Sequence, residues 1–346
     1  MRCVVAPPGA QSPRPPAEAL GAVRHLAARF PTARLRQVPV LRANELDLRA
    51  DPGGQTRVWL ALEALQVTGS FKVRGALSAL DALRDRGRVV AASAGNHGAA
   101  VAYAASVLGL EATVCVPRTI ARAKRERIER YGAELVIAQS DHYDDAEALG
   151  KELAVSQGTS FVSAYDDELV VLGNGTSLGF EIVRALGGVP ERVVTPFGGG
   201  GLATGLAWAM EADSREPGPP TVWGAQSEAS CAMAMSLERG AAVERLETGG
   251  TTLAEGLEGG ISADAFERAR AVVAGVVVVT EGQIASAMEY GYEDLGLVLE
   301  GSAAAALAPV LSGLPAQVCG GDLVVVLTGR NVDAERLDQA RRVSAG

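Results

Sequence analysis

The stretch RVVTPFGGGGLATGLAWAM, residues 192–210, joins a β-branched run to an apolar segment through four consecutive glycines. The β-branched residues favour a buried strand, and the segment from Leu202 onward is long enough to favour a helix. Glycines at such a junction let the backbone N–H groups at the start of the helix approach an anion closely. The stretch therefore predicts a strand, an anion-binding loop and a helix, which together form one unit of an α/β fold.

The same alternation continues along most of the chain. Short apolar runs alternate with helical segments, and this order is typical of parallel sheets with helices on both faces. We therefore predict an α/β protein with parallel-type sheets flanked by helices. Strands are expected at residues 88–92, 112–116, 134–138, 160–163, 192–195, 221–225, 276–280 and 323–328, and helices near 96–107, 119–131, 144–156, 174–186, 201–212, 283–294 and 333–342.

Charge and composition narrow the class of function. The 346 residues include 32 Lys plus Arg against 41 Asp plus Glu, a net charge of −9, which argues against binding of nucleic acid. Four dispersed cysteines and three histidines give no zinc or disulfide pattern. The proline-rich start lacks the apolar core of a signal peptide and is expected to be partly disordered. The longest apolar run, residues 271–279, is too short for a membrane span. A cytoplasmic protein acting on a small molecule is expected.

Four polar loops lie at, or close to, predicted strand ends. In open α/β sheets ligands bind beyond the carboxyl ends of the strands, where helices begin. The four loops are Thr68-Gly69-Ser70-Phe71-Lys72, Ser93-Ala94-Gly95-Asn96-His97-Gly98, Gly198-Gly199-Gly200-Gly201 and Thr328-Gly329-Arg330-Asn331.

The tetraglycine loop has three possible interpretations. It could be a flexible turn, or part of a dinucleotide site, since Gly198, Gly200 and Ala203 satisfy G-x-G-x-x-A. A dinucleotide site needs an acid at the end of the following strand for the ribose hydroxyls, and this chain has Gln226 there. A phosphate bound without ribose contacts fits better.

Lysine is scarce in this chain, which has it only at Lys72, Lys124 and Lys151. Lys124 and Lys151 lie in charged helical runs and are expected on solvated helix faces. Lys72 stands beside Phe71 in a short loop, where desolvation could keep its amine neutral for condensation with a carbonyl. An amine of this kind together with a phosphate loop indicates pyridoxal 5′-phosphate, unless Lys72 is an ordinary surface lysine.

Several motifs, in this order and spacing, resemble the threonine/serine dehydratase family, which belongs to the tryptophan-synthase-β-like, fold type II pyridoxal-phosphate enzymes. The resemblance covers about residues 36–332 and implies a two-domain α/β fold. After a lead-in of residues 1–35 come a large cofactor-binding domain, 36–87 and 167–346, and a small mobile domain, 88–166. The motifs are SFKVRGA at 70–76, SAGNHG at 93–98, YDD at 165–167, GNGT at 173–176, GGGGL at 198–202 and EGSA at 300–303.

The resemblance also implies roles for individual residues. Lys72 would carry the cofactor and then remove the substrate Cα proton, and Asn96 would bind the ring hydroxyl. Thr328 would place its hydroxyl beside the ring nitrogen, where it stabilises the reaction's carbanion less than a carboxylate would and so favours β-elimination. Arg330 departs from the family's usual glycine and could reach the ring edge. Further cofactor contacts are expected from Phe71, Gly198, Gly199, Gly200, Gly201, Leu202 and Glu300, and substrate contacts from Ser93, Ala94, Gly95, Asn96 and His97.

Three positions of the sequence, Ala94, Gln226 and Ala232, bear on related activities of the family. Racemases of this family carry a second proton-transfer serine where this chain has Ala94, so racemisation is not expected. Many racemase-like members bind a divalent cation with acids that here are Gln226 and Ala232, so no metal is expected at that site. Threonine synthase or β-replacement activity, and other β-hydroxy amino acids such as hydroxyaspartate or phenylserine, stay open.

Two alternatives come from other classes of protein. Gly175 to Gly179 satisfies the G-x-S-x-G pattern of serine hydrolases, but every histidine precedes Ser177. A noncatalytic amino-acid-binding protein is the other possibility. The expected protein is a homodimeric ammonia-lyase that converts threonine or serine into a 2-oxo acid and ammonia.

Overall fold

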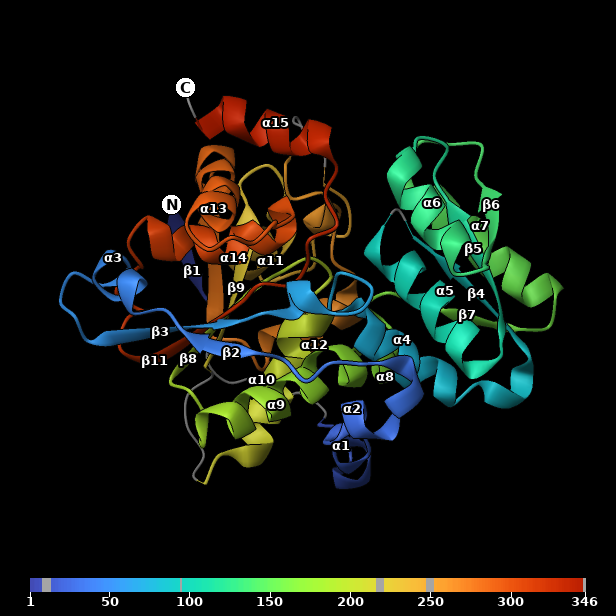
Figure 1. Ribbon diagram of the computed structural model, residues 1–346, viewed down its shortest axis with the longest axis horizontal. Helices are drawn as coiled ribbons and strands as arrows, with labels where there is room; N and C mark the ends of the chain where they lie inside the picture. Colours follow the sequence, from blue (N-terminus) through green and yellow to red (C-terminus); the bar gives the residue numbers. More distant parts are fainter. Residues whose placement is uncertain (8–13, 94, 216–220, 247–251, 345–346) are drawn as a thin grey trace.

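Two β-sheets organise the chain in the computed structural model, which describes residues 1–7, 14–93, 95–215, 221–246 and 252–344 (Figure 1). The smaller sheet is drawn from one continuous part of the sequence and has the strand order β6-β5-β4-β7. All its pairings are parallel. Its strands are β4 (Arg88–Ala92), β5 (Glu111–Val116), β6 (Glu134–Ile137) and β7 (Ser160–Val162).

The larger sheet has seven strands in the order β1-β10-β9-β8-β11-β3-β2. Its five inner strands are parallel, and the two edge strands pair antiparallel to them. The strands are β1 (Arg2–Val5), β2 (Val40–Arg42), β3 (Thr56–Ala61), β8 (Arg192–Pro196), β9 (Val222–Ser227), β10 (Gly275–Val279) and β11 (Gly321–Val326).

Alternation along the inner strands explains why helices cover both faces of this sheet. Leu323 and Val325 of β11 pack into one cluster, whereas Val324 and Val326 pack into another, because successive strand side chains point to opposite faces. The first cluster includes α3 (Asp47–Ala50), α13 (Glu281–Glu293), α14 (Gly301–Leu311) and α15 (Ala334–Ser344), and the second includes α9 (Ser177–Leu186), α10 (Gly201–Asp213), α11 (Ala232–Arg239) and α12 (Ala263–Arg270).

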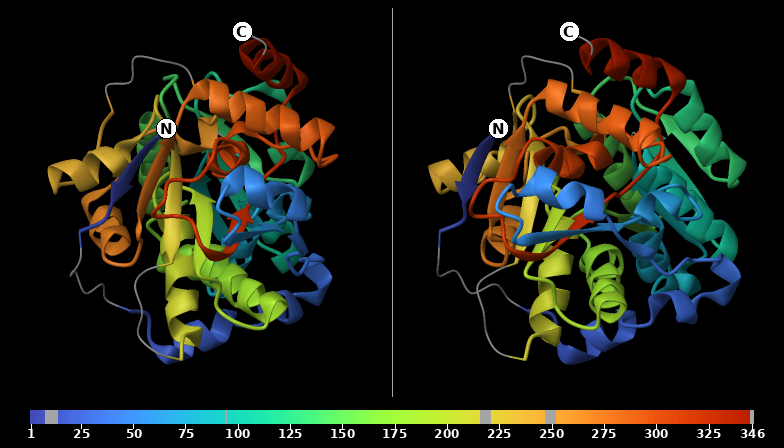
Figure 2. Two further views of the ribbon diagram at one scale, coloured as in Figure 1. Left: turned by 90° about the vertical axis from the view of Figure 1, so that its left-hand side faces the viewer. Right: turned by 60° about the vertical axis from the view of Figure 1, so that its left-hand side comes forward.

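The smaller sheet is covered in the same way, and it lies beside the larger part of the molecule (Figures 1 and 2). One face packs on α5 (Asn96–Leu108) and on α4 (Lys72–Asp81). Helix α4 comes before the strands of this sheet in the sequence. The other face packs on α7 (Tyr143–Ser156). Further helical segments are α1 (Ala17–Val23), α2 (Leu26–Arg29), α6 (Arg122–Arg130), α8 (Glu168–Val171), the π-helical turn η5 (Leu172–Thr176), and the short turns η1 (Pro31–Ala33), η2 (Asn44–Leu46), η3 (Glu63–Leu65), η4 (Arg84–Arg86) and η6 (Glu255–Leu257).

The predicted α/β class with parallel-type sheets is confirmed. Strand β1, near the start of the chain, pairs with β10 and was not predicted from the sequence. Strand β3 and helices α11, α12 and α14 are likewise absent from the predicted elements. Helix α14 has no polar face because all of its residues up to Val310 are buried, so its sequence has no amphipathic period to detect.

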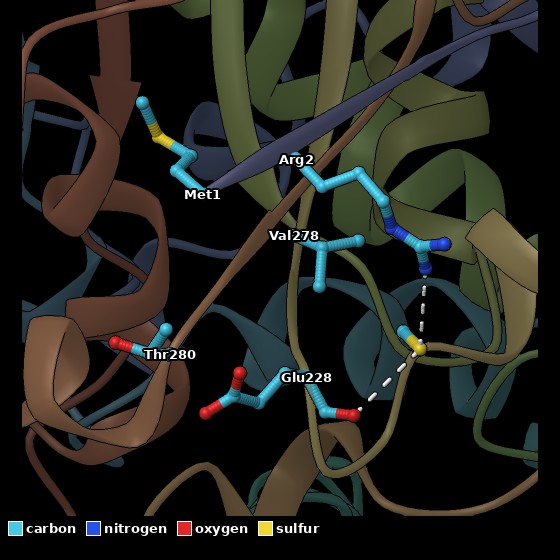
Figure 3. Close-up of a pocket in the computed structure, with 6 residues that line it drawn as sticks. Met1, Arg2, Glu228, Val278 and Thr280 are labelled. Carbon is cyan, nitrogen blue, oxygen red and sulfur yellow. Dashed lines mark hydrogen bonds between the residues drawn. The ribbon is translucent and has the colours of Figure 1, made fainter.

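One helical stretch, Glu168–Leu186, has the length and hydropathy to cross a membrane, with 72% of it buried inside the protein. A core helix of a globular protein has the same properties. A surface pocket lies beside strand β1, and Figure 3 shows the side chains around it. None of the predicted site residues lines it. Its lining residues are Met1, Arg2, Glu228, Cys231, Val278 and Thr280.

Candidate active site

Lys72 is the first residue of α4, and its side chain is partly buried. Its Nζ donates one hydrogen bond, to the carbonyl of Ala164 at 3.2 Å, and lies 5.2 Å from the centre of the Phe71 ring. Burial lowers the pKa of Lys72 to about 8, because the charged form loses its hydration, and the nearby carboxylate of Glu300 opposes this shift. Near physiological pH, Lys72 is therefore neutral in an appreciable fraction of the protein molecules.

Helix α4 is anchored by a buried ion-pair cluster two residues after Lys72. Arg74 is fully buried, with Nε 2.9 Å from Glu63 and Nη2 2.8 Å from both Glu63 and Glu181. Glu181 also accepts a hydrogen bond from the backbone N–H of Val38. The cluster joins α4 to η3 and α9, and so it fixes the start of the helix that carries Lys72.

The tetraglycine loop follows β8 and begins α10, as predicted. Gly200 has φ +83°, which favours glycine, and a Cβ at Gly199 would lie 2.8 Å from the ring of Tyr165. Among the described residues, the N–H groups of Gly198, Gly199, Gly200 and Gly201 have no acceptor. Leu202, in the first helical turn, is buried beside them. The loop thus presents free donors at the positive end of a thirteen-residue helix.

The loop of residues 93–97 follows β4 and leads into α5. The hydroxyl of Ser93 accepts a hydrogen bond from the N–H of Gly95. His97 Nε2 lies 3.1 Å from the carbonyl of Val162, so Nε2 carries the proton and the buried Nδ1 is left without a partner among the described residues. Burial, and next Lys72, lower the pKa of His97 to about 3, so the ring is neutral. Ala94 lies outside the described residues.

Asn96, Glu300 and Asn331 form a closed hydrogen-bonded ring. Asn96 Nδ2 donates to both carboxylate oxygens of Glu300, at 2.8 and 3.0 Å. Asn331 donates from Nδ2 to Asn96 Oδ1 at 2.6 Å and from its backbone N–H to Glu300 at 3.2 Å. Burial raises the pKa of Glu300, and the Asn96 amide opposes that shift. The amide of Asn96 is therefore held in one orientation by loops from three parts of the chain.

The loop after β11 lies directly against the Lys72 loop. Phe71 donates its N–H to the carbonyl of Thr328, and Ser70 forms an isolated antiparallel β-bridge with Gly329. A Cβ at Gly329 would lie 2.4 Å from a carboxylate oxygen of Glu300, so any side chain there would displace that carboxylate. The side chain of Thr328 is buried in this contact. The guanidinium of Arg330 donates to the carbonyl of Ala64, which directs it toward η3.

The other two lysines differ from one another. Lys151 pairs with Glu147 one helical turn away and is 59% exposed, as expected for a solvated face. For Lys124 the expectation was wrong: it is 24% exposed and pairs with Glu255, which lies 131 residues away in sequence. The charged run around Lys124 indicated a solvated helix because nothing local reveals a partner so distant.

Two further sequence motifs have ordinary structural surroundings. Gln226 is buried, donates to the carbonyl of Phe197 and accepts from the N–H of Ala234, so its amide tethers the tetraglycine loop to α11. The hydroxyl of Ser177 is buried, donates to the carbonyl of Gly173 and lies 3.3 Å from Arg74. In the described part of the chain, no histidine contacts Ser177, and no group of three or more His, Cys, Asp or Glu side chains is placed to hold a metal ion.

Sequence reasoning missed three residues of this region. Asn331 was quoted within its loop but given no role, and Tyr165 belonged to a weaker motif. Glu255 lies in an irregular, glycine-rich segment with no motif at all. For Asn331, the signal was its place next to Arg330 in a loop after a strand, which is where ligands bind in such sheets.

Comparison with known proteins decides the family. The family model of pyridoxal-phosphate dependent enzymes matches residues 32–329. This chain belongs to that family. Within it, the chain is a member of the threonine/serine dehydratase group, and it is a pyridoxal-phosphate enzyme of fold type II.

Three relatives illustrate the relationship. The L-threonine ammonia-lyase of Thermotoga maritima is 38% identical over 291 residues, covering 83% of this chain and 70% of that protein. The solved threonine deaminase from T.th. has a TM-score of 0.79 and 33% identity over 92% of this chain and 99% of that one. Maize serine racemase has a TM-score of 0.80 and 25% identity, covering 94% and 96%.

The residues present fit pyridoxal phosphate. The cofactor needs an amine that can be neutral for its aldehyde, donors for its phosphate and a polar partner for its ring hydroxyl. The chain offers the desolvated amine of Lys72, the free N–H groups of the tetraglycine loop and the oriented amide of Asn96. A side chain at Gly199 would collide with Tyr165, so the loop is kept open for a close backbone approach.

Proposed function

We propose that this pyridoxal-phosphate enzyme is an ammonia-lyase that converts threonine or serine into a 2-oxo acid and ammonia. The observation that carries the proposal is the neutral-capable amine of Lys72, which bonds to Ala164, together with the tetraglycine loop, which packs on the adjoining Tyr165 and begins a helix. The names of the threonine ammonia-lyase of Thermotoga maritima and the threonine deaminase from T.th. support this substrate class.

Lys72 is the proposed catalytic residue. Its amine holds the cofactor and, once the substrate amine has displaced it, accepts the proton from the substrate Cα. Burial favours this because a base with a pKa near the working pH is partly unprotonated and still accepts a proton readily. Pyridoxal phosphate, when bound, supplies the electron sink that stabilises the charge left on Cα.

The remaining proposed roles follow from position. The N–H groups of Gly198, Gly199, Gly200, Gly201 and Leu202 bind the cofactor phosphate, and Asn96 binds the ring hydroxyl. Glu300 fixes the Asn96 amide, Phe71 packs beside Lys72, and Thr328 places a hydroxyl at the ring nitrogen. The substrate carboxylate binds at the start of α5, where Ser93, Ala94, Gly95, Asn96 and His97 supply donors.

β-Elimination is favoured over racemisation by residue type. Racemisation needs a second acid or base on the opposite face of Cα, and Ala94 has no group that carries a proton. The proposal therefore includes no second proton-transfer residue in this loop. It also includes no divalent cation at Gln226 and Ala232, where the chain offers an amide and a methyl group.

The proposed setting is a cytoplasmic homodimer with a mobile small domain. The compartment and the dimer are carried over from the family resemblance, and the names of the relatives are those of metabolic enzymes. For the domain division, after a lead-in of 1–35, the support is that residues 88–162 alone supply the smaller sheet, within the proposed small domain 88–166. The large domain would be 36–87 and 167–346.

A substrate screen tests the function. Holoenzyme is mixed with threonine, serine, hydroxyaspartate or phenylserine, and release of 2-oxo acid and ammonia is measured together with any D-serine formed from L-serine. The expected result is rapid 2-oxo acid release from threonine or serine with no D-serine. If only another hydroxy amino acid is turned over, that amino acid replaces threonine and serine as the proposed substrate. A protein that binds cofactor but turns over none of them would favour β-replacement or a binding role.

A further inference from the structure

An ion pair joins the two parts of the molecule next to the site. Lys124 extends from α6, which flanks the smaller sheet, and its ammonium contacts the carboxylate of Glu255 in η6, which belongs to the larger part. The two side chains are 24% and 30% exposed. Each is thus largely removed from water, and their attraction is weakened less by solvent than that of a surface pair.

The aliphatic stem of Lys124 passes beside Gly95, in the loop proposed to bind substrate. An ideal Cβ on Gly95 would lie 3.8 Å from Lys124 Cδ and 4.0 Å from Cε, which is ordinary van der Waals contact. The next helical turn of α6 lies against the start of α5, because Ile128 Cδ1 would be 3.0 Å from a Cβ on Gly98. Lys124 thus runs from a helix that packs on the start of α5, past Gly95, to the ion pair with Glu255.

Glu255 is attached to the other half of the site. The carbonyl of Gly256 would lie 3.2 Å from a Cβ on Gly198, and the N–H of Gly256 donates to Ser302 at the start of α14. The η6 turn that carries Glu255 thus packs against the phosphate loop. Arg336 of α15 donates from Nε to the same carboxylate at 2.6 Å, so Glu255 is held by two cations from different elements.

We propose that Lys124 and Glu255 are positioning residues whose ion pair holds the substrate loop, residues 93–97, against the phosphate loop, residues 198–201, before substrate binds. This role rests on the proposed ammonia-lyase function. Arg336 keeps the Glu255 carboxylate directed toward Lys124. Neither Lys124 nor Glu255 exchanges a proton with the substrate in this proposal.

The Lys124–Glu255 ion pair is expected to affect substrate binding. If the two loops are aligned in only a fraction of the molecules, the apparent affinity for substrate falls by that fraction. Once substrate bridges the loops itself, the alignment needed for proton removal by Lys72 is restored. Loss of the ion pair should therefore raise KM and leave kcat nearly unchanged.

The test uses holoenzyme carrying Lys124→Met, Glu255→Gln or both. The control is Asp141→Asn, which breaks the ion pair with Arg118, at 2.8 Å, within the part that holds the smaller sheet. Two quantities are measured: KM and kcat for threonine or serine, and amide hydrogen exchange of peptides spanning residues 93–98. The exchange measurement requires no turnover.

Each single substitution should raise KM about fivefold, the size expected for an ion-pair energy near the top of the range for partly solvated pairs. The exchange of residues 93–98 should become faster in both. The double variant should be no worse than the more affected single variant, because both remove one interaction. Asp141→Asn should change neither quantity.

The proposal would be overturned by unchanged exchange and KM in both single variants, or by a double variant whose effects multiply. A fall in kcat with KM unchanged would also overturn it. If wild-type holoenzyme releases no 2-oxo acid from any hydroxy amino acid, the proposed function fails. The exchange measurement then still decides whether the pair holds the substrate loop.

Discussion

At the scale of single residues, the central feature is a partly desolvated amine. Among the described residues, the amine of Lys72 has one hydrogen-bond acceptor, the carbonyl of Ala164, which replaces only part of the hydration that its charged form loses. Glu300 offsets only part of this cost. The result is a lysine whose amine is partly neutral at a pH where an ordinary lysine is fully charged.

The pH dependence of cofactor attachment tests this feature. With a pKa of about 8, the neutral amine rises from about a tenth of molecules at pH 7 to about nine-tenths at pH 9. The rate at which cofactor-free protein takes up pyridoxal phosphate should therefore rise about tenfold between pH 7 and 9 and level off above that. A rate that still climbs steeply above pH 9 would show an ordinary lysine pKa.

Lys72 could be found from the sequence, whereas Lys124 could not. Scarcity of lysine left three candidates, and Phe71 with the neighbouring motif singled out Lys72. The role of Lys124 depends on Glu255, which lies 131 residues away, and no local pattern encodes that contact. The ring of Asn96, Glu300 and Asn331 likewise joins three distant loops, so only folding reveals it.

At the scale of elements, α4 depends on the buried pairing of Arg74 with Glu63 and Glu181. Replacing Arg74 with Ala leaves two buried carboxylates without a counter-charge, which typically costs about 3–5 kcal/mol of unfolding free energy. Chemical denaturation of the variant should show this loss, together with weaker cofactor binding, because α4 carries Lys72.

The matched control for that substitution is Arg125→Ala. Arg125 pairs with Glu129 one turn along α6, and both side chains are more than 40% exposed. Exposed pairs of this kind contribute less than about 1 kcal/mol. Equal losses for the Arg74 and Arg125 variants would show that the buried cluster does not anchor α4.

Helix α10, which begins at the phosphate loop, is positioned by close contact with the π-helical turn η5. A Cβ on Gly175 would lie 2.4 Å from the carbonyl of Leu202 and 2.7 Å from Gly205 Cα. Gly175→Ala must therefore push α10 away, at a cost of about 1–3 kcal/mol, and weaken cofactor affinity. Denaturation and a cofactor titration would measure both effects.

Gly188→Ala is the control for this contact. Gly188 has no neighbouring atom within 4 Å of an added Cβ, and its φ is not in the left-handed region. The substitution should leave both stability and cofactor affinity close to wild type. A Gly175 variant as stable as the Gly188 variant would show that α10 has room to move.

Elements whose sequence has a clear hydrophobic pattern could be predicted, whereas fully buried elements were harder to predict. Strands such as β4 and β8 have β-branched runs bounded by turn residues, and their predicted bounds agree with the structure to within a residue. Helix α14 and strand β3 were not predicted. The alanine-rich α14 is apolar on every side, so its role in the core becomes visible only when its neighbours are placed.

At the scale of the whole molecule, the site forms where loops from both sheets meet. The substrate loop follows β4 of the smaller sheet, whereas the phosphate loop and the Thr328 loop follow β8 and β11 of the larger sheet. Parallel strands bring their carboxyl ends to one edge, so loops far apart in sequence become neighbours. This rule allowed the loops to be grouped from the sequence, although their contacts could not be derived from it.

The central claim is that Lys72 alone carries the cofactor and acts as the base. Reduction of the holoenzyme with borohydride fixes the cofactor onto whichever amine holds it, and peptide mass spectrometry then locates the label. The label should be found on Lys72 and be absent from Lys124, Lys151 and the Lys72→Ala variant, which should also release no 2-oxo acid. A label on Lys124 or Lys151, or a Lys72→Ala variant that keeps both label and turnover, would contradict the account.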